Sequence, residues 1–307
     1  MKPWKSIDEQ IAILRSRGMT ISDDTRAQNA LKRFGYYRLS GYWYSFRQHE
    51  SDGTLSDHFI DNTHLSEIVD LYIFDKRLRL LALDALERIE LALQVDVAHS
   101  LGAIDPVGHT SITHLNRGVA NKSERHDRKT NFEIWSSKYG ELKKRAKHRA
   151  FVRHNLDEYG ELPIWVAIEV FDFGTLSHLF KMMRRTDRDK IAAKYGLPGG
   201  HILEQWLKSL TYIRNVSAHH ERLWNNNIKD SSVIPPQFSE MAKSNQYRTF
   251  RYLCIMQFLL NQICPNSSWK HRTREHLLAF PTPANKGVEV SQLGVVEGWE
   301  NWALWKA

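Results

Sequence analysis

Apolar positions repeat at helical spacing along almost the whole chain. The segment 6–18 opens with a capping-box pair, Ser6 and Glu9, continues with apolar residues at intervals of four and three, and reaches Gly18 where a helix C-terminus belongs. A second helix is predicted over 23–34, ahead of Gly35. These patterns predict that the N-terminal region is helical.

The segment 63–101 holds 39 residues without proline or glycine and is rich in Leu, Ile and Val. It predicts either one very long helix or two helices broken near Asp75. Its centre carries one apolar stripe, made of Leu81, Leu86, Ile89 and Leu93. The segment 102–129 contains glycine, proline and a polar run, so we expect a long surface loop there.

Helical signals resume after this loop. We expect a break and an N-cap at Gly174 and Thr175, and we expect helices over 131–159, 164–173, 176–185, 187–195, 201–224 and 247–264. No alternating apolar segment is longer than a few residues, so the expected class is all-α, a multi-helix bundle. We divide it into N-terminal helices and an aromatic cluster (1–62), a helical core (63–230) with a basic loop and helix insertion near 102–150, and C-terminal helices with a tail (231–307).

Composition excludes several classes of protein. The chain has 307 residues, of which 42% are apolar, so it is neither disordered nor collagen-like. Only Cys254 and Cys264 are present, which excludes a disulfide framework and a cysteine-rich zinc site, and we expect two buried thiols. The N-terminus lacks a signal peptide and no apolar run is long enough to cross a bilayer, so we expect a cytoplasmic protein without a membrane partner.

Two further clusters suit a polyanionic partner. The net charge is +8 and the pI is about 9.4, which fits RNA, DNA or an acidic membrane surface. A basic stretch could face phosphates, although a solvated helix face explains it nearly as well: Lys143, Lys144, Arg145, Lys147 and Arg149 with His148. Six aromatic residues within 36–46 could stack bases, but packing of a helical core is the commoner use of such a cluster.

The segment 214–224 reads Arg-Asn-Val-Ser-Ala-His-His-Glu-Arg-Leu-Trp. On a continued helix at about 100° per residue, Asn215, His219 and Arg222 share one polar face. His220 then points with the core residues and is expected to be structural. Arg214 lies about 140° from His219, so a regular helix keeps them apart. We therefore expect either a distorted helix or a composite site that a second copy completes.

Other chemistries find little support in the sequence. His219, His220 and Glu221 are consecutive, which spreads them around a helix, whereas a zinc-binding helix needs ligands four residues apart. We therefore expect no metal. No glycine-rich phosphate loop of the Walker type occurs, so we expect no nucleotide and no other cofactor.

The pattern of Arg214 and Asn215 followed at four residues' distance by His219 resembles the signature of HEPN-superfamily ribonucleases. More narrowly, the chain is similar to the abortive-infection Abi (AbiD/AbiF-like) family of bacterial proteins. The resemblance covers roughly residues 5–230 and extends to further blocks: Tyr36–Trp43, Phe74–Arg79, Glu87–Glu90 and Phe173–Ser177. It implies a HEPN-like helical core, a role in anti-phage defence and a metal-independent endoribonuclease that acts as a toxin.

The residue chemistry suits that activity. RNA carries its own nucleophile, the 2′-hydroxyl; histidine can serve as acid or base near neutral pH, and arginine stabilises charge on phosphate. We assign His219 as general acid/base, Arg214 as phosphate stabiliser and Asn215 as the residue that orients the substrate or the imidazole. Candidate lining residues are His220, Arg222, Arg88 and Glu90, although a buried ion pair explains the last two equally well.

Two alternatives stay open. One is an RNA-binding protein without catalysis that holds a small non-coding RNA through the surface 143–149. The other is a protein-interaction module in which the aromatic cluster and the tail residues Trp299, Trp302 and Trp305 bind a phage or host protein. The expected partners are RNA and a second copy of the chain, and an antidote RNA or protein is a further candidate.

Overall fold

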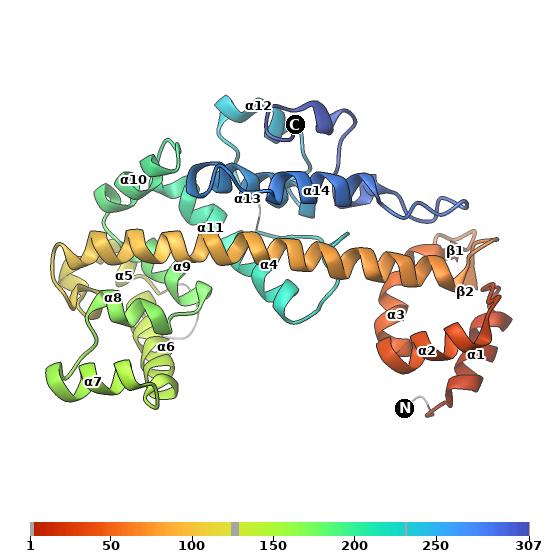
Figure 1. Ribbon diagram of the computed structural model, residues 1–307, viewed down its shortest axis with the longest axis horizontal. Helices are drawn as coiled ribbons and strands as arrows, with labels where there is room; N and C mark the ends of the chain where they lie inside the picture. Colours follow the sequence, from red (N-terminus) through yellow and green to blue (C-terminus); the bar gives the residue numbers. More distant parts are fainter. Residues whose placement is uncertain (1–2, 124–128, 231, 307) are drawn as a thin grey trace.

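A single uninterrupted helix, α4 (Leu65–Gly102), runs along the length of the molecule (Figure 1). The computed structural model describes residues 3–123, 129–230 and 232–306. Of the two readings of this segment, one long helix is therefore correct, and Asp75 lies inside it, fully buried. The all-α prediction is confirmed, because the described residues add only a small two-stranded sheet to the helices.

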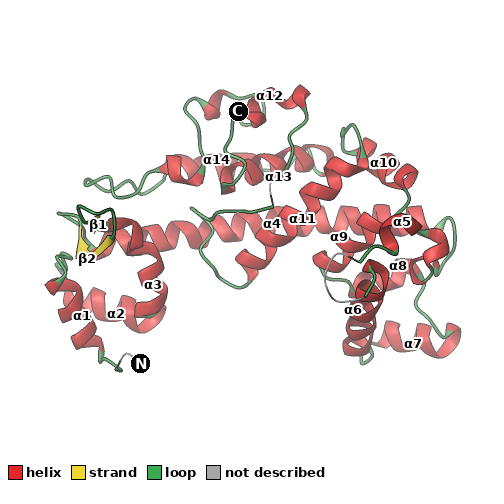
Figure 2. Ribbon diagram, turned by 180° about the vertical axis from the view of Figure 1, so that it is seen from behind, coloured by secondary structure: helices red, strands yellow, loops and turns green. Residues whose placement is uncertain are grey.

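The N-terminal elements gather at one end of α4 (Figures 1 and 2). They are α1 (Ile7–Ser16), α2 (Asp24–Phe34), α3 (Tyr36–Trp43), and the antiparallel strands β1 (Arg47–His49) and β2 (Leu55–Phe59). The predicted capping box is present, since the Ser6 side chain accepts from the Glu9 amide and Glu9 accepts from the Ser6 amide. The Asp23 side chain caps α2 by accepting a hydrogen bond from the Arg26 amide.

The middle of the chain packs at the other end of α4. It comprises α5 (Arg117–Ala120), α6 (Asn131–Ala146), α7 (Ala150–Tyr159), α8 (Ile164–Ala167) and α9 (Phe173–Met182). The expected break at Gly174 and Thr175 is wrong: both lie in the first turn of α9, whose cap is Asp172. A carboxylate at the N-cap satisfies the free amide of Thr175 at 2.7 Å, so no later break is needed.

The described part of the region expected as a surface loop after α4, residues 102–123, is more ordered than predicted, and residues 124–128 of that expected loop lie outside the described residues. It forms 3₁₀ turns at 108–110 and 112–114 as well as α5. His109, Leu115 and Ala120 are buried, because the segment packs against α6 and α9.

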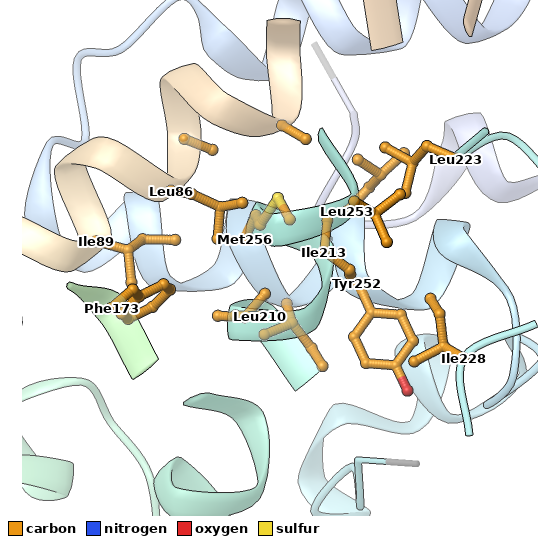
Figure 3. Packing of buried hydrophobic residues seen from close by; sticks show 14 of the residues in the cluster. Leu86, Ile89, Phe173, Leu210, Ile213, Leu223, Ile228, Tyr252, Leu253 and Met256 are labelled. Atoms are coloured by element: carbon orange, nitrogen blue, oxygen red, sulfur yellow. The ribbon is translucent and has the colours of Figure 1, made fainter. Parts of the chain in front are cut away.

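The C-terminal helices complete the core. They are α10 (Arg185–Lys194), α11 (Gly200–Ala218), α12 (Ser239–Ala242), α13 (Thr249–Ile263) and α14 (Trp269–Leu278). Helices α11 and α13 pack along α4, and Figure 3 shows the residues that interlock there, among them Ile89, Ile213 and Met256. Gly200 lets α10 approach α11, because a Cβ at this position would lie 2.4 Å from that of Arg188.

Among the helices of the described residues, none combines the length and the apolar character that a membrane span requires.

Candidate functional site

Helix α11 ends six residues earlier than predicted, at Ala218. The His220 amide bonds the Ser217 carbonyl and the Glu221 amide bonds the Val216 carbonyl, which is the hydrogen-bond pattern of a Schellman C-cap. His220 occupies its left-handed position, with φ +60°. Sequence reasoning missed this ending because glycine is the usual residue there. The prediction that His220 points into the core is wrong, since its side chain is exposed.

Two arginines from other helices hold the chain just after this turn. Arg38 of α3 donates to the His220 carbonyl at 2.7 Å, and Arg79 of α4 donates to the Glu221 carbonyl at 3.1 Å. These bonds satisfy the carbonyls of the two residues that follow the C-cap and therefore have no partner within the helix. The exposed His219, which precedes them, therefore sits on a backbone fixed from two sides.

Asp75 anchors the backbone of Leu223 and Trp224, a little further along the chain. Its carboxylate accepts from the amides of Leu223 and Trp224 at 3.2 and 2.8 Å, from the Tyr42 hydroxyl at 2.7 Å and from Arg79 at 2.5 Å. Burial, followed by the nearby negative charge of Asp75, raises the pKa of Tyr42 far above its usual value. A buried charge with this many donors fixes local geometry strongly. No role was assigned to these residues from sequence, although an Asp and an Arg four apart on a buried helix face are a usable signal.

Arg214 and Asn215 line an open cavity of about 360 Å³ between α6, α9 and α11. Lys138 and His178 line the same cavity, together with Asp172. Burial acts to raise the pKa of Asp172, but hydrogen bonds from Thr175 and the charge of Lys138 outweigh it and hold that pKa below its ordinary value. Sequence reasoning missed Lys138 and His178, which lie on separate helices far from Arg214 in the chain.

Arg214 also borders a second cavity, of about 420 Å³, with Glu90 of α4. Glu87 and Glu169 line it too. Burial raises the pKa of Glu90, and the positive charge of Arg214 opposes this rise. The structure thus brings Glu90 and Arg214 to one cavity. This is the arrangement expected when Glu90 was named as a candidate lining residue of the Arg214 site.

His219 is not brought to Arg214 within one chain. Arg214 faces the two cavities just described, whereas His219 is exposed at the C-terminus of α11 and lines neither of them. The angular separation expected from the sequence therefore persists, and the distortion of the helix begins after Ala218, too late to remove it.

Two candidate lining residues face elsewhere. Arg222 donates to the Gly41 carbonyl and borders a shallow pocket with Tyr37 and Tyr44. Arg88 bonds Ser267 at 2.5 Å and pairs with Asp84. The placement of Arg88 beside the Arg214 site is therefore wrong: it faces the C-terminal segment, and the i,i+4 aspartate holds it there.

In the basic stretch 143–149, one lysine faces the protein and the other cations face the solvent. Lys143 points inward and binds Glu161 at 2.6 Å, so it is not a phosphate-facing residue, contrary to the prediction. Burial acts to raise the pKa of Glu161, but Lys143 and other hydrogen bonds outweigh it and lower that pKa. The exposed cations are Lys144, Arg145, Lys147 and Arg149.

Most of the aromatic side chains offered for partner binding are core residues. Trp299, Trp302 and Trp305 are buried against α13 and α14, so the idea of a tryptophan-bearing tail surface is wrong. In the cluster 36–46, Tyr37 and Tyr44 are exposed, while the other aromatic residues are buried or half-buried.

Cys254 is buried as expected, but Cys264 is only half-buried. Within the described ranges, no group of three or more His, Cys, Asp or Glu side chains is placed to hold a metal ion.

Comparison with known proteins places most of the chain in a family. The family model described as Abi-like protein matches residues 29–225, from α2 to the segment beyond α11 that Asp75 anchors. Neither the curated proteins nor the solved structures contain a match. Because the family model covers more than half of the chain, this protein belongs to the Abi-like family of abortive-infection proteins.

Proposed function

We propose that this abortive-infection protein is a metal-independent HEPN-type endoribonuclease whose site forms between two copies of the chain. One copy supplies Arg214 and Asn215, and the partner subunit supplies His219. The observation that carries the proposal is the placement of these side chains along and at the end of one helix: Arg214 and Asn215 border an open cavity, and His219 stands exposed on a fixed turn. None of them is sealed in apolar packing.

The chemistry would use the substrate's own nucleophile. The 2′-oxygen of a ribose attacks the adjacent phosphorus, and the His219 imidazole takes the proton of that hydroxyl. The bond from phosphorus to the 5′-oxygen breaks, and the 5′-oxygen takes a proton from water. Arg214 stabilises the negative charge that builds on the phosphate, and Asn215 orients it. The products are a 2′,3′-cyclic phosphate and a 5′-hydroxyl.

The test compares Arg214→Ala and His219→Ala with wild type, and His148→Ala is the matched control at an exposed histidine. Expression of wild type should arrest cell growth, and purified wild type should produce RNA ends with cyclic phosphate. Each site variant should lower the cleavage rate by about 10²-fold or more, the usual contribution of an acid or base. Undiminished cleavage by His219→Ala would refute the mechanism.

A mixing experiment tests the shared site. In an equimolar mixture of Arg214→Ala and His219→Ala subunits, half of the dimers are mixed, and each mixed dimer keeps one intact site. Activity should therefore recover to about a quarter of wild type. No recovery, with dimers demonstrated by sedimentation, would contradict a site built across the interface.

A second candidate function is RNA binding without cleavage. The exposed cations Lys144, Arg145, Lys147 and Arg149 favour it, because they form a surface at the junction of α6 and α7 that could contact phosphates. Copurification of RNA of one discrete size with an uncleaving protein would support this function.

A further inference from the structure

Two cavities in the described part of the chain lie side by side and share lining residues, and we treat them together as one groove. The 360 Å³ cavity that Arg214 and Asn215 line shares Ile134 and His178 with a neighbouring cavity of about 580 Å³. The second cavity continues along the same three helices, α6, α9 and α11, and is lined by Asn131, Ile134, Ser177, His178, Lys181, Glu204, Gln205 and Lys208. His178, which is exposed, stands at the junction.

Helix periodicity explains why one groove forms. Residues three, four and seven apart share a helix face, and α9 presents Gly174, Ser177, His178 and Lys181 in that spacing. Helix α11 presents Lys208 and Asn215, which are seven residues apart and therefore share a face, about 10.5 Å apart along its axis at 1.5 Å per residue. A Cβ on Gly174 would lie 3.6 Å from the Thr211 side chain, so the two helices approach closely at the groove floor.

The groove carries a positive balance. Its lining includes four permanent cations, Lys138, Lys181, Lys208 and Arg214, and two carboxylates, Asp172 and Glu204.

Both carboxylates are already engaged. Asp172 caps α9 and lies 3.5 Å from Lys138, and Glu204 pairs with Arg188 outside the groove. Lys208 bonds Asp230 at 2.7 Å, but both side chains are more than 40% exposed. Such a surface pair contributes little, so Lys208 can exchange this partner for a phosphate.

We infer that the α6–α9–α11 groove binds the backbone of a single-stranded RNA, with Lys181 and Lys208 contacting phosphates next to the one held by Arg214. The inference rests on the proposed function only for the identity of the polyanion. A concave, positive groove that ends on Arg214 and Asn215 suits a strand better than the exposed cations of 144–149, because its walls fix the path of the backbone.

The experiment measures binding of a fluorescent mixed-sequence single-stranded RNA to the full-length protein over a range of salt. All variants carry His219→Ala, so that the probe is not consumed. Each phosphate contact contributes about 0.7 to the slope of log affinity against log salt for a single strand. Lys181→Gln with Lys208→Gln should lower the slope by about 1.4, which means about 25-fold weaker binding at 0.1 M salt.

The matched control removes two charges elsewhere. Lys32→Gln with Lys243→Gln, which removes two exposed charges outside both candidate RNA surfaces, should leave the salt slope equal to that of the His219→Ala protein. Lys144→Gln with Lys147→Gln separately tests the competing surface 144–149. A second groove variant, Lys181→Arg with Lys208→Arg, keeps both charges and should restore binding. Equal melting temperatures of the Gln and Arg variants show that the loss reflects charge and not misfolding.

The outcomes separate this inference from the proposed function. If the 144/147 variant weakens binding while the 181/208 variant does not, the groove inference is overturned. If the groove variant binds normally while cleavage depends on Arg214 and His219, the groove fails and the proposed function stands. If wild type cleaves no RNA but binds it with a slope that depends on Lys181 and Lys208, the groove stands and the nuclease proposal fails.

Discussion

His220 holds a backbone conformation that side chains other than glycine seldom adopt. Its φ of +60° completes the C-cap of α11, and its carbonyl accepts a hydrogen bond from Arg38. The left-handed region costs an L-residue about 1–2 kcal/mol relative to a right-handed helix. The hydrogen bonds that Arg38 and Arg79 donate to the segment 220–224, and those that its amides donate to Asp75, offset that cost and keep the preceding His219 at the surface.

A glycine at this position should therefore stabilise the fold. We expect His220→Gly to raise the free energy of unfolding by roughly 1 kcal/mol, because glycine adopts the left-handed conformation without strain. Urea unfolding followed by circular dichroism measures the change. His219→Gly is the matched control: its φ is −88°, so glycine there brings no relief and should not stabilise. A destabilised His220→Gly would show that the imidazole itself contributes to folding.

The segment between α4 and α6 shows how an element with loop-like composition can enter the core. His109 is fully buried there, surrounded by Trp135, Tyr139 and Phe171. Burial lowers the pKa of His109 to about 4. The ring is therefore neutral in the folded protein at neutral pH.

This buried ring should make stability sensitive to acid. The folded-state pKa lies below the unfolded value of 6.5, so the unfolded chain binds the proton first and stability is lost as the pH falls from 6.5 towards 4. Between pH 7.5 and pH 5 this one histidine should lower the free energy of unfolding by about 2 kcal/mol.

The measurement is the free energy of unfolding at both pH values for wild type and His109→Gln. The drop on acidification should be smaller in His109→Gln by about 2 kcal/mol, whatever its absolute stability. His148→Gln, at an exposed histidine, should keep the wild-type drop. An unchanged drop in His109→Gln would mean that the ring titrates normally in the folded state.

At the scale of the whole molecule, the C-terminal segment closes the core instead of extending from it. Trp305 is fully buried, lies 6.1 Å from the Phe250 ring and 6.2 Å from the Trp269 ring, and its indole N–H points at the Cys254 sulfur at 3.3 Å. Trp269 in turn donates to the Leu81 carbonyl of α4. The segment beyond the family match is therefore packed into the same core.

Removing this closure should weaken the fold. We expect Trp305→Ala to lower the free energy of unfolding by about 3–5 kcal/mol, because it leaves a large cavity among aromatic rings. Trp4→Ala removes the same atoms from a side chain that is 85% exposed, and should change stability by no more than about 0.5 kcal/mol. Equal stability of the two variants in denaturant unfolding would show that the tail does not belong to the core.

The difference between what could and could not be predicted follows the range of the interactions involved. The helices α1 and α2 were predictable because their N-caps and apolar periodicity depend on residues within a few turns of the chain, whereas for α4 the same periodicity left one helix or two open. The end of α11 was not, since its left-handed residue is a histidine and its bonds come from α3 and α4.

For the candidate site, too, local features were predictable and contacts between distant parts of the chain were not. The sequence by itself determined the helical class and the presence of Arg214, Asn215 and His219 on or beside one helix, because these depend on local spacing. The family followed from resemblance over most of the chain. Only the tertiary structure decided that Arg88 and Lys143 turn away to nearby acids, and that Lys138 and His178 join Arg214. Those contacts depend on how α4, α6, α9 and α11 pack, and packing is set by the shapes of distant side chains.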